Sequence, residues 1–303
     1  MQQSSIPICS FPSTAIFLDD NHDFLLNFVL QLDETVAYKT FDDASTALNY
    51  IQNKQSNADS LSLHCLSDKT SAQENSDTHR TIDLDLASIY KEIYNPNRFS
   101  EVSVVVVDYA MPGMDGLEFC RRIKNKNIKK ILLSGKADEK LAIAAFNEGL
   151  INCYVKKSDV DAAEQVTQSL NTLQQQYFHA MSDTIAKMLS LTSPNYMHDL
   201  KFTQCFHALC QEHNIVEYYL IDNLGSYLLI NDDAHLSLLR IQNKRDTTEQ
   251  ILQTASSSVL FQAEEQDYYA LIQPVLPMPI QQEKILSYNR YLEELDAEAL
   301  LID

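Results

Sequence analysis

Short apolar runs alternate with segments of helical periodicity from Ser13 to about residue 160. Runs such as TAIFLDD, VVVVD and KKILLS end in polar residues, and between them apolar residues recur three or four positions apart. Strands that alternate with helices indicate βαβ units. The four valines at 104–107 show no polar alternation, which is typical of a central strand buried on both faces. We therefore predict an α/β, doubly wound sheet of five parallel strands over residues 13–160.

A long insertion interrupts this pattern at about residues 52–98. The stretch NKQSNADSLSLHCLSDKTSAQENSDTHR after Gln52 is rich in Ser, Asn and Asp. Such a composition cannot bury enough apolar surface to offset the entropy of ordering, so we predict a mobile loop. A helix is predicted over 82–94, closed by Asn95-Pro96.

The rest of the chain predicts a helical connector at 161–193 and an α+β output domain at 194–303. The stretch from Val160 to about Leu191 contains no Gly or Pro and predicts one extended helix, or two in line. Beyond it we predict a helix over 195–213, a hairpin VEYYLID-NLGS-YLLIND, a strand HLSLLRI, a helix over 246–255, a strand near VLF or YYALIQ and a terminal helix.

Composition excludes several classes of protein. The formal net charge of −19 argues against DNA binding and against anionic lipid surfaces. No window approaches 18 consecutive apolar residues and no signal peptide precedes Ser13, so we expect a cytoplasmic protein without membrane insertion. Only 5 glycines occur, so glycine-rich nucleotide-binding loops are absent. The six cysteines form no CxxC pair, which favours reduced thiols.

Acidic residues end two of the predicted strands. Asp19 and Asp20 follow IFL, and Asp108 follows VVVV. Functional groups of open α/β sheets gather beyond the carboxyl ends of the strands, so these carboxylates should meet and bind Mg²⁺, which prefers oxygen ligands. Ser134 and Lys156 end two further strands, and a hydroxyl and an ammonium there can hold the oxygens of a phosphoryl group.

These motifs, DD, VVVVDYAMPGMDG, ILLSGKADE and GLINCYVKK, closely resemble the flavodoxin-like receiver domain of two-component response regulators. The resemblance implies that Asp108 accepts a phosphoryl group from the phosphohistidine of a sensor histidine kinase or phosphotransfer protein. It also implies that Mg²⁺ is held by Asp19, Asp20, Asp108 and the backbone carbonyl of Ala110, while Ser134 and Lys156 contact the new phosphate. Such a receiver catalyses only its own phosphorylation and dephosphorylation, and often forms a homodimer when phosphorylated.

The sequence departs from the family pattern in three ways. The family usually has an aromatic residue three positions before its lysine, where this chain has Cys153, with Tyr154 beside it. A proline commonly follows the lysine, and here that residue is Lys157. Asp20 and Asp108 are separated by about forty residues more than usual, well beyond an ordinary loop. The first departure puts the usual switch coupling in question.

The predicted output domain carries no recognisable enzyme motif. DTTEQILQTA is acidic, unlike a DNA-recognition helix. Cys205, His207, Cys210 and His213 are zinc-ligand types, but at helical spacing they spread around the axis. Two hypotheses remain: an output that acts through protein contact, or one that binds or processes nucleotides or nucleic acid under receiver control. A receiver with a long insertion and such an output resembles the quorum-sensing response regulators of Legionella.

Overall fold

The chain divides into two compact units, which are described separately. The parallel-sheet unit comprises Pro12–Asp59 and Asn97–Met181. The antiparallel-sheet unit comprises Met1–Phe11, Ser60–Pro96 and Ser182–Asp303. The structure, a computed structural model, describes residues 5–64, 66–68, 82–84, 86–135, 139–189, 199–222, 224–243, 258–262, 268–274 and 285–299.

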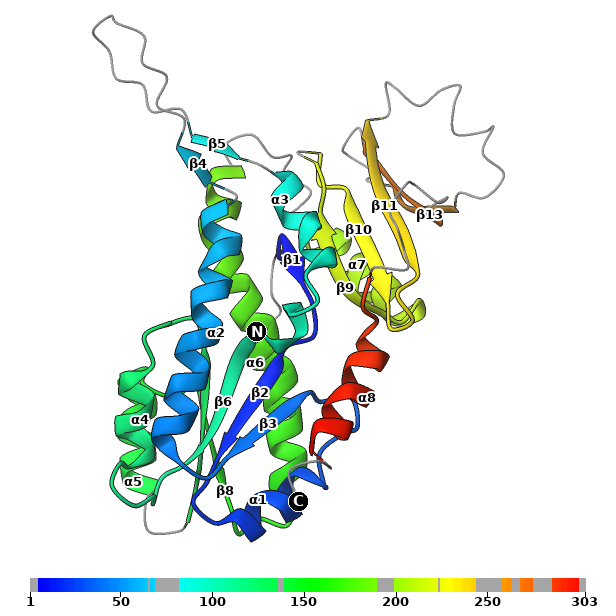
Figure 1. Cartoon of the computed structure of the whole chain (residues 1–303). Helices are drawn as coiled ribbons and strands as arrows, with labels where there is room; N and C mark the ends of the chain where they lie inside the picture. Colours follow the sequence, from blue (N-terminus) through cyan, green and yellow to red (C-terminus); the bar gives the residue numbers. More distant parts are fainter. Residues whose placement is uncertain are drawn as a thin grey trace, which may run out of the picture. The chain divides into compact units, whose positions relative to one another are not determined.

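The parallel-sheet unit contains the predicted five-stranded parallel sheet (Figure 1). Its strands, in spatial order, are β3 (Tyr38–Phe41), β2 (Thr14–Leu18), β6 (Val102–Asp108), β7 (Lys129–Ser134) and β8 (Cys153–Lys156). All neighbouring pairs are parallel. The strand order reverses between β2 and β6, so the carboxyl ends of these two strands flank the switch point where such folds place their functional groups. The predicted fold class is confirmed.

Helices cover both faces of this sheet. On one face, α1 (His22–Val29) and α6 (Ala162–Leu189) bury apolar side chains in a common core with β2, β6, β7 and β8. The stripe Val166, Leu170 and Leu173 has the spacing of one helix face, which explains why α6 packs here. The other side of the sheet carries α2 (Ala44–His64), α4 (Gly116–Arg122) and α5 (Glu139–Asn147) (Figure 1).

The region predicted as an insertion contains more regular structure than its composition indicated. Helix α2 continues from Asn53 to His64, where the sequence predicted a loop. Two short strands, β4 (Leu66–Asp68) and β5 (Ile82–Leu84), form an antiparallel pair. The helix predicted over 82–94 begins only at α3 (Leu86–Tyr90), which continues as the 3₁₀ helix η1 (Lys91–Tyr94), and a second 3₁₀ helix, η2 (Arg98–Ser100), leads into β6.

The antiparallel-sheet unit has the predicted α+β character. Its sheet has six strands, in the order β1 (Cys9–Ser10), β9 (Ile215–Leu220), β10 (Tyr227–Asn231), β11 (Leu236–Asn243), β13 (Tyr268–Pro274) and β12 (Ser258–Gln262). The helices of this unit include α7 (Leu200–Glu212) and α8 (Tyr288–Ala299). The predicted hairpin is present as β9 and β10, joined by a turn in which Gly225 has φ +88°. The helix predicted over 246–255 lies outside the described residues.

Strand β1 comes from the start of the chain and forms an edge of this sheet. It pairs antiparallel with β9, so that Cys9 lies opposite Tyr219. The amide of Leu220 donates to the carbonyl of Ile8, and the hydroxyl of Tyr227 donates to the carbonyl of Pro7. Ile6, Ile8 and Phe11 are buried. The N-terminal segment is therefore a packed part of the antiparallel-sheet unit.

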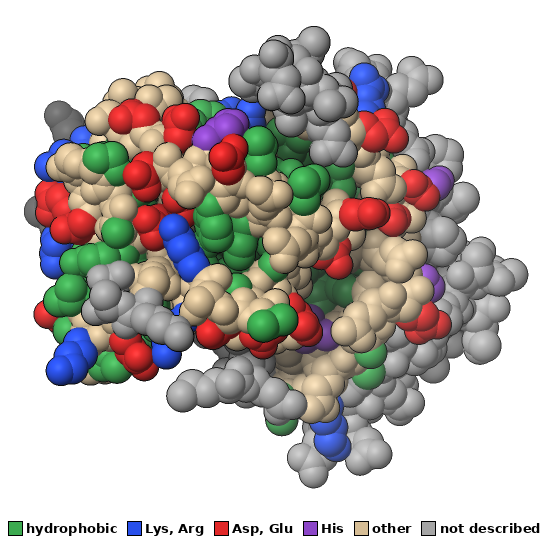
Figure 2. Space-filling view, turned by 90° about the horizontal axis from the view of Figure 1, so that it is seen from below, with side chains coloured by type: hydrophobic (Ala, Val, Ile, Leu, Met, Phe, Trp, Pro, Cys, Tyr) green, Lys and Arg blue, Asp and Glu red, His purple; other side chains and the backbone are tan. Residues whose placement is uncertain are grey.

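No helix within the described residues is long and apolar enough to span a membrane. Acidic side chains are spread over the face shown in Figure 2, where basic ones are fewer, as expected for a chain with 42 acidic and 23 basic residues.

Candidate phosphoacceptor site

The sequence of β6 fixes where Asp108 lies. Seven residues, VSVVVVD, are all buried, so the strand is anchored up to its last residue, where Asp108 stands 5% exposed. The chain then turns sharply, and the amide of Gly116 donates to the carbonyl of Tyr109 at 3.0 Å. A β-carbon on Gly116 would lie 2.2 Å from the backbone oxygen of Asp108. The turn therefore requires glycine at position 116.

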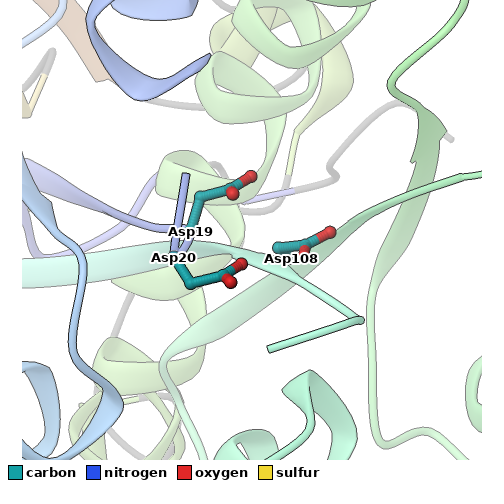
Figure 3. Close-up of side chains that lie close together, drawn as sticks. All are labelled: Asp19, Asp20 and Asp108. Carbon is teal, nitrogen blue, oxygen red and sulfur yellow. The ribbon is translucent and has the colours of Figure 1, made fainter. Parts of the chain in front are cut away.

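Three carboxylates meet at this edge of the sheet. Asp19 and Asp20 directly follow β2, the neighbour of β6. One oxygen of each of Asp19, Asp20 and Asp108 lies within 4.8 Å of the others. Figure 3 shows the three side chains close together. Asp19 is 2% exposed, whereas Asp20 is exposed to solvent. The structure thus brings together all three predicted acidic residues.

Lys157 is the basic residue that contacts this cluster. Its Nζ lies 2.5 Å from Oδ2 of Asp19 and 2.8 Å from Oδ1 of Asp108. Lys156, which the sequence predicted for this place, instead pairs with Oε2 of Glu139 at 3.2 Å. The reason is strand geometry: successive side chains of β8 point to opposite faces, and Val155 faces the core on the side of α1 and α6. Lys157, the first residue after β8, lies on the same side as Val155 and contacts the carboxylates, whereas Lys156 points away.

The other two predicted residues lie in segments that border the site. Ser134 is fully buried at the end of β7, and its hydroxyl donates to the carbonyl of Gly135 at 3.4 Å. The amide of Lys157 donates to the carbonyl of Ser134 at 3.0 Å, which ties the ends of β7 and β8 together. The amide of Ala110 donates to Oδ2 of Asp108 at 3.2 Å, so the backbone of Ala110 lies beside the Asp108 carboxylate.

Burial dominates the electrostatics of Asp19. Loss of solvent raises the pKa of the Asp19 carboxyl, and the nearby Asp108 charge acts in the same direction. Hydrogen bonds from Lys157 and from the Asn21 amide, together with the charge of Lys157, partly oppose this rise in pKa. Lys157 therefore compensates only part of the negative charge of this acidic pocket. A further cation bound here would stabilise the ionised carboxylates.

The donor set fits a hard divalent cation. Asp19, Asp20 and Asp108 offer carboxylate oxygens within bonding reach of one centre, and Mg²⁺ binds such sites through a few carboxylates plus water. The ammonium of Lys157 already lies between two of them, so the pocket accepts positive charge at this point. Within the described residues no other group of three or more metal-ligand side chains converges. Cys205, His207 and Cys210 of α7 and His213, its C-cap, form no such group.

Comparison with known proteins agrees with this geometry. The sequence profile of the response regulator receiver domain matches residues 74–176. The solved structure of the Legionella pneumophila response regulator LqsR is 47% identical, covers 98% of both chains and superposes with a TM-score of 0.76. The chain belongs to the response regulator family. Because the LqsR match extends over nearly the whole chain, it includes the antiparallel-sheet unit as well as the receiver.

A shorter match is found to another response regulator. The cyclic di-GMP phosphodiesterase response regulator RpfG of Xanthomonas campestris pv. campestris is 42% identical over 59 residues. These are 18% of this chain and only 16% of RpfG, so this chain matches a small part of that relative.

The presence of Lys157 in the receiver site was missed from the sequence, although a signal was available. The resemblance includes an aromatic residue three positions before the lysine. Counting back from Lys156 gives Cys153, but counting back from Lys157 gives Tyr154. Shifting the alignment of GLINCYVKK by one residue would therefore have matched both the lysine of the family, as Lys157, and the aromatic residue three positions before it, as Tyr154.

Proposed function

We propose that this response regulator is switched by phosphorylation of Asp108. The donor is the phosphohistidine of a sensor histidine kinase or phosphotransfer protein, the partner that a receiver domain implies. The observation that carries this proposal is the placement of Asp108: a nearly buried carboxylate at the switch point of the sheet, with Asp19, Asp20 and Lys157 around it.

The reaction transfers one phosphoryl group. An oxygen of Asp108 forms a bond to phosphorus while the bond between phosphorus and the histidine nitrogen breaks. The nitrogen keeps the electron pair of the broken bond, and the product is an acyl phosphate on Asp108. Catalysis of this step depends chiefly on positioning and on positive charge near the transferred oxygens.

We assign roles to the surrounding residues on the basis of their positions. Asp19, Asp20, Asp108 and the backbone carbonyl of Ala110 would hold Mg²⁺, and the ion when bound supplies charge that offsets the phosphoryl oxygens. Lys157 takes the role that the sequence suggested for Lys156, because its ammonium already contacts Asp108. Ser134 supplies a hydroxyl at the end of the neighbouring strand, and Tyr154 occupies the position of the aromatic switch residue.

Phosphorylation would act on the surface formed by α5 and β8. The phosphate adds about −1.5 to −2 charges, which draws Lys157 and Ser134 toward it. Leu141, Ile143 and Phe146 of α5 are about half exposed, with exposed fractions of 47%, 54% and 54%. Ile143 and Phe146, three residues apart, share one side of α5, whereas Leu141 lies elsewhere around the helix. The exposed pair supports phosphorylation-promoted homodimerisation. By its overall layout, the protein would act in quorum sensing through an output that works by protein contact.

Labelling with radioactive acetyl phosphate and Mg²⁺ tests the assignment. The intact protein should incorporate phosphate in an acid-stable, hydroxylamine-labile linkage, and Asp108→Asn should not. Asp115→Asn is a matched control in the following loop, where the carboxylate caps α4 by accepting from the amide of Glu118 at 2.7 Å. Equal labelling of the intact protein and Asp108→Asn would overturn the proposal.

A further inference from the structure

An aromatic row leads from the core of the receiver to the ammonium of Lys157. Phe17 of β2 packs against Phe28 of α1 with ring centroids 6.2 Å apart, and Phe28 stacks on Phe24 at 5.3 Å. At the end of this row, Nζ of Lys157 lies 4.5 Å from the centroid of the Phe24 ring. This distance is within the range of a cation–π interaction.

The backbone holds Phe24 in a fixed relation to the carboxylates. Asn21 caps α1, and its side-chain oxygen accepts from the amide of Phe24 at 3.0 Å. The amide of Asn21 in turn donates to Oδ1 of Asp19 at 3.0 Å. Since Lys157 contacts both Asp19 and the Phe24 ring, the four residues form a closed ring of contacts.

We propose that Phe24 is a positioning residue that holds the ammonium of Lys157 against Asp108. A lysine side chain has four flexible carbons and loses rotamer entropy when its end is fixed. The ammonium contacts the carboxylates of Asp19 and Asp108. It also lies over the electron-rich face of the Phe24 ring, which attracts it. The side chain of Lys157 is 23% exposed, so partial loss of water strengthens the attraction. The functional part of this inference rests on the proposed role of Asp108.

The alternative is that Phe24 only fills space at the edge of the core. Replacement by leucine would not separate the two roles, because it changes shape and charge distribution together. Fluorination separates them, since it weakens the negative potential of the ring face while nearly preserving ring size. The test therefore uses phenylalanine with one, two or three fluorine atoms at position 24, incorporated into the full-length protein. The same series at Phe28, whose ring packs against Phe17 and Phe24, is the matched control.

Two readouts are compared in each series. The first is the upfield ring-current shift of the Lys157 Cε protons, measured by NMR in the metal-free protein. The resonance is assigned to Lys157 because it disappears in Lys157→Arg. The second is the rate of acetyl phosphate labelling with Mg²⁺. We expect the labelling rate to fall stepwise with fluorine number at position 24, by about two- to five-fold for three fluorines, and to stay constant at position 28. The ring-current shift should be present in the unmodified protein and should decrease along the position-24 series only.

Each outcome decides a separate point. A Lys157 signal without a ring-current shift would overturn the contact itself. Labelling that depends on Asp108 but responds equally to fluorination at Phe24 and Phe28, or to neither, would overturn the positioning role and leave the proposed function intact. Labelling that persists in Asp108→Asn would overturn the proposed function, and the functional role of Phe24 would fall with it.

Discussion

The ammonium of Lys157 lies 2.8 Å from Oδ1 of Asp108, while its chain neighbour Lys156 pairs with Glu139 on the opposite face of β8. Two adjacent lysines, the last residue of β8 and the first residue after it, therefore point to opposite sides of the sheet. This arrangement supplies a matched pair of variants for the site.

If Asp108 is phosphorylated as proposed, Lys157→Met should slow labelling by at least about ten-fold, because it removes the positive charge beside the Asp108 carboxylate. Lys156→Met should change the rate by less than about two-fold, since the exposed pair with Glu139 contributes little. Initial rates of acetyl phosphate labelling measure both. A larger effect at Lys156 than at Lys157 would contradict the assignment of the lysine.

A substitution of Asp20 should affect metal binding without affecting folding. Its side chain is exposed, so Asp20→Asn should change the free energy of unfolding by less than about 0.5 kcal/mol. As one of three converging carboxylates, it should nevertheless contribute strongly to Mg²⁺ affinity, and we expect a loss of about ten-fold or more. Isothermal titration calorimetry with Mg²⁺ measures this. Asp23→Asn, in the first turn of α1, is the control. An equal loss of Mg²⁺ affinity in both variants would indicate general attraction by negative charge and not a site formed by Asp20.

Gly116 is required by close backbone approach. Gly116→Ala places a β-carbon 2.2 Å from the backbone oxygen of Asp108, so the turn that follows β6 must move. We expect destabilisation of about 2 kcal/mol or more and slower labelling of Asp108. Gly135→Ala, where the new β-carbon meets nothing within 4 Å, should be nearly neutral in urea unfolding. Similar urea-unfolding midpoints for the two variants would contradict this prediction, because they would show that the turn can shift at little cost in stability.

The N-terminal segment should stabilise the antiparallel-sheet unit. Ile8 is 1% exposed, and its carbonyl accepts from the amide of Leu220. Ile8→Ala should therefore destabilise this unit by about 2 to 4 kcal/mol, through lost burial and the cavity left behind. Hydrogen exchange of the Leu220 amide should accelerate accordingly. The control Leu224→Ala changes a half-exposed side chain and should leave exchange unchanged.

Thiol reactivity should follow burial. Loss of solvent raises the pKa of Cys120 and of Cys210 to about 12, so at pH 8 only about one thiol in ten thousand is ionised. Both should resist iodoacetamide in the folded protein at pH 8 and gain reactivity as the pH approaches 12. In urea all six cysteines should be alkylated. Peptide mass spectrometry locates the modified residues, and rapid labelling of Cys120 at pH 8 in native buffer would contradict its burial.

The sequence by itself determined the sheet and the acidic part of the site. Runs of buried residues such as VVVV define a strand locally, and the residue that ends the run is read directly, so Asp19, Asp20 and Asp108 could be predicted together. The long helix α6 was predicted from an uninterrupted stretch that contains no Gly or Pro. These features depend on neighbours in the chain, and short-range patterns encode them.

Only the tertiary structure decided which lysine reaches Asp108, what β1 pairs with, and what lies beside Lys157. Aligning GLINCYVKK with the family pattern one residue differently assigns Lys157 instead of Lys156 to the site, and the side chains of neighbouring residues point to opposite faces. The sequence allowed both alignments. Strand β1 pairs with β9, about two hundred residues further along the chain, and its two residues carry no pattern of their own. Phe24 meets Lys157 because α1 covers the face of the sheet toward which Val155 of β8 points, and Lys157 follows β8 on that side. Contacts of this kind depend on how distant elements come together, which a local pattern does not specify.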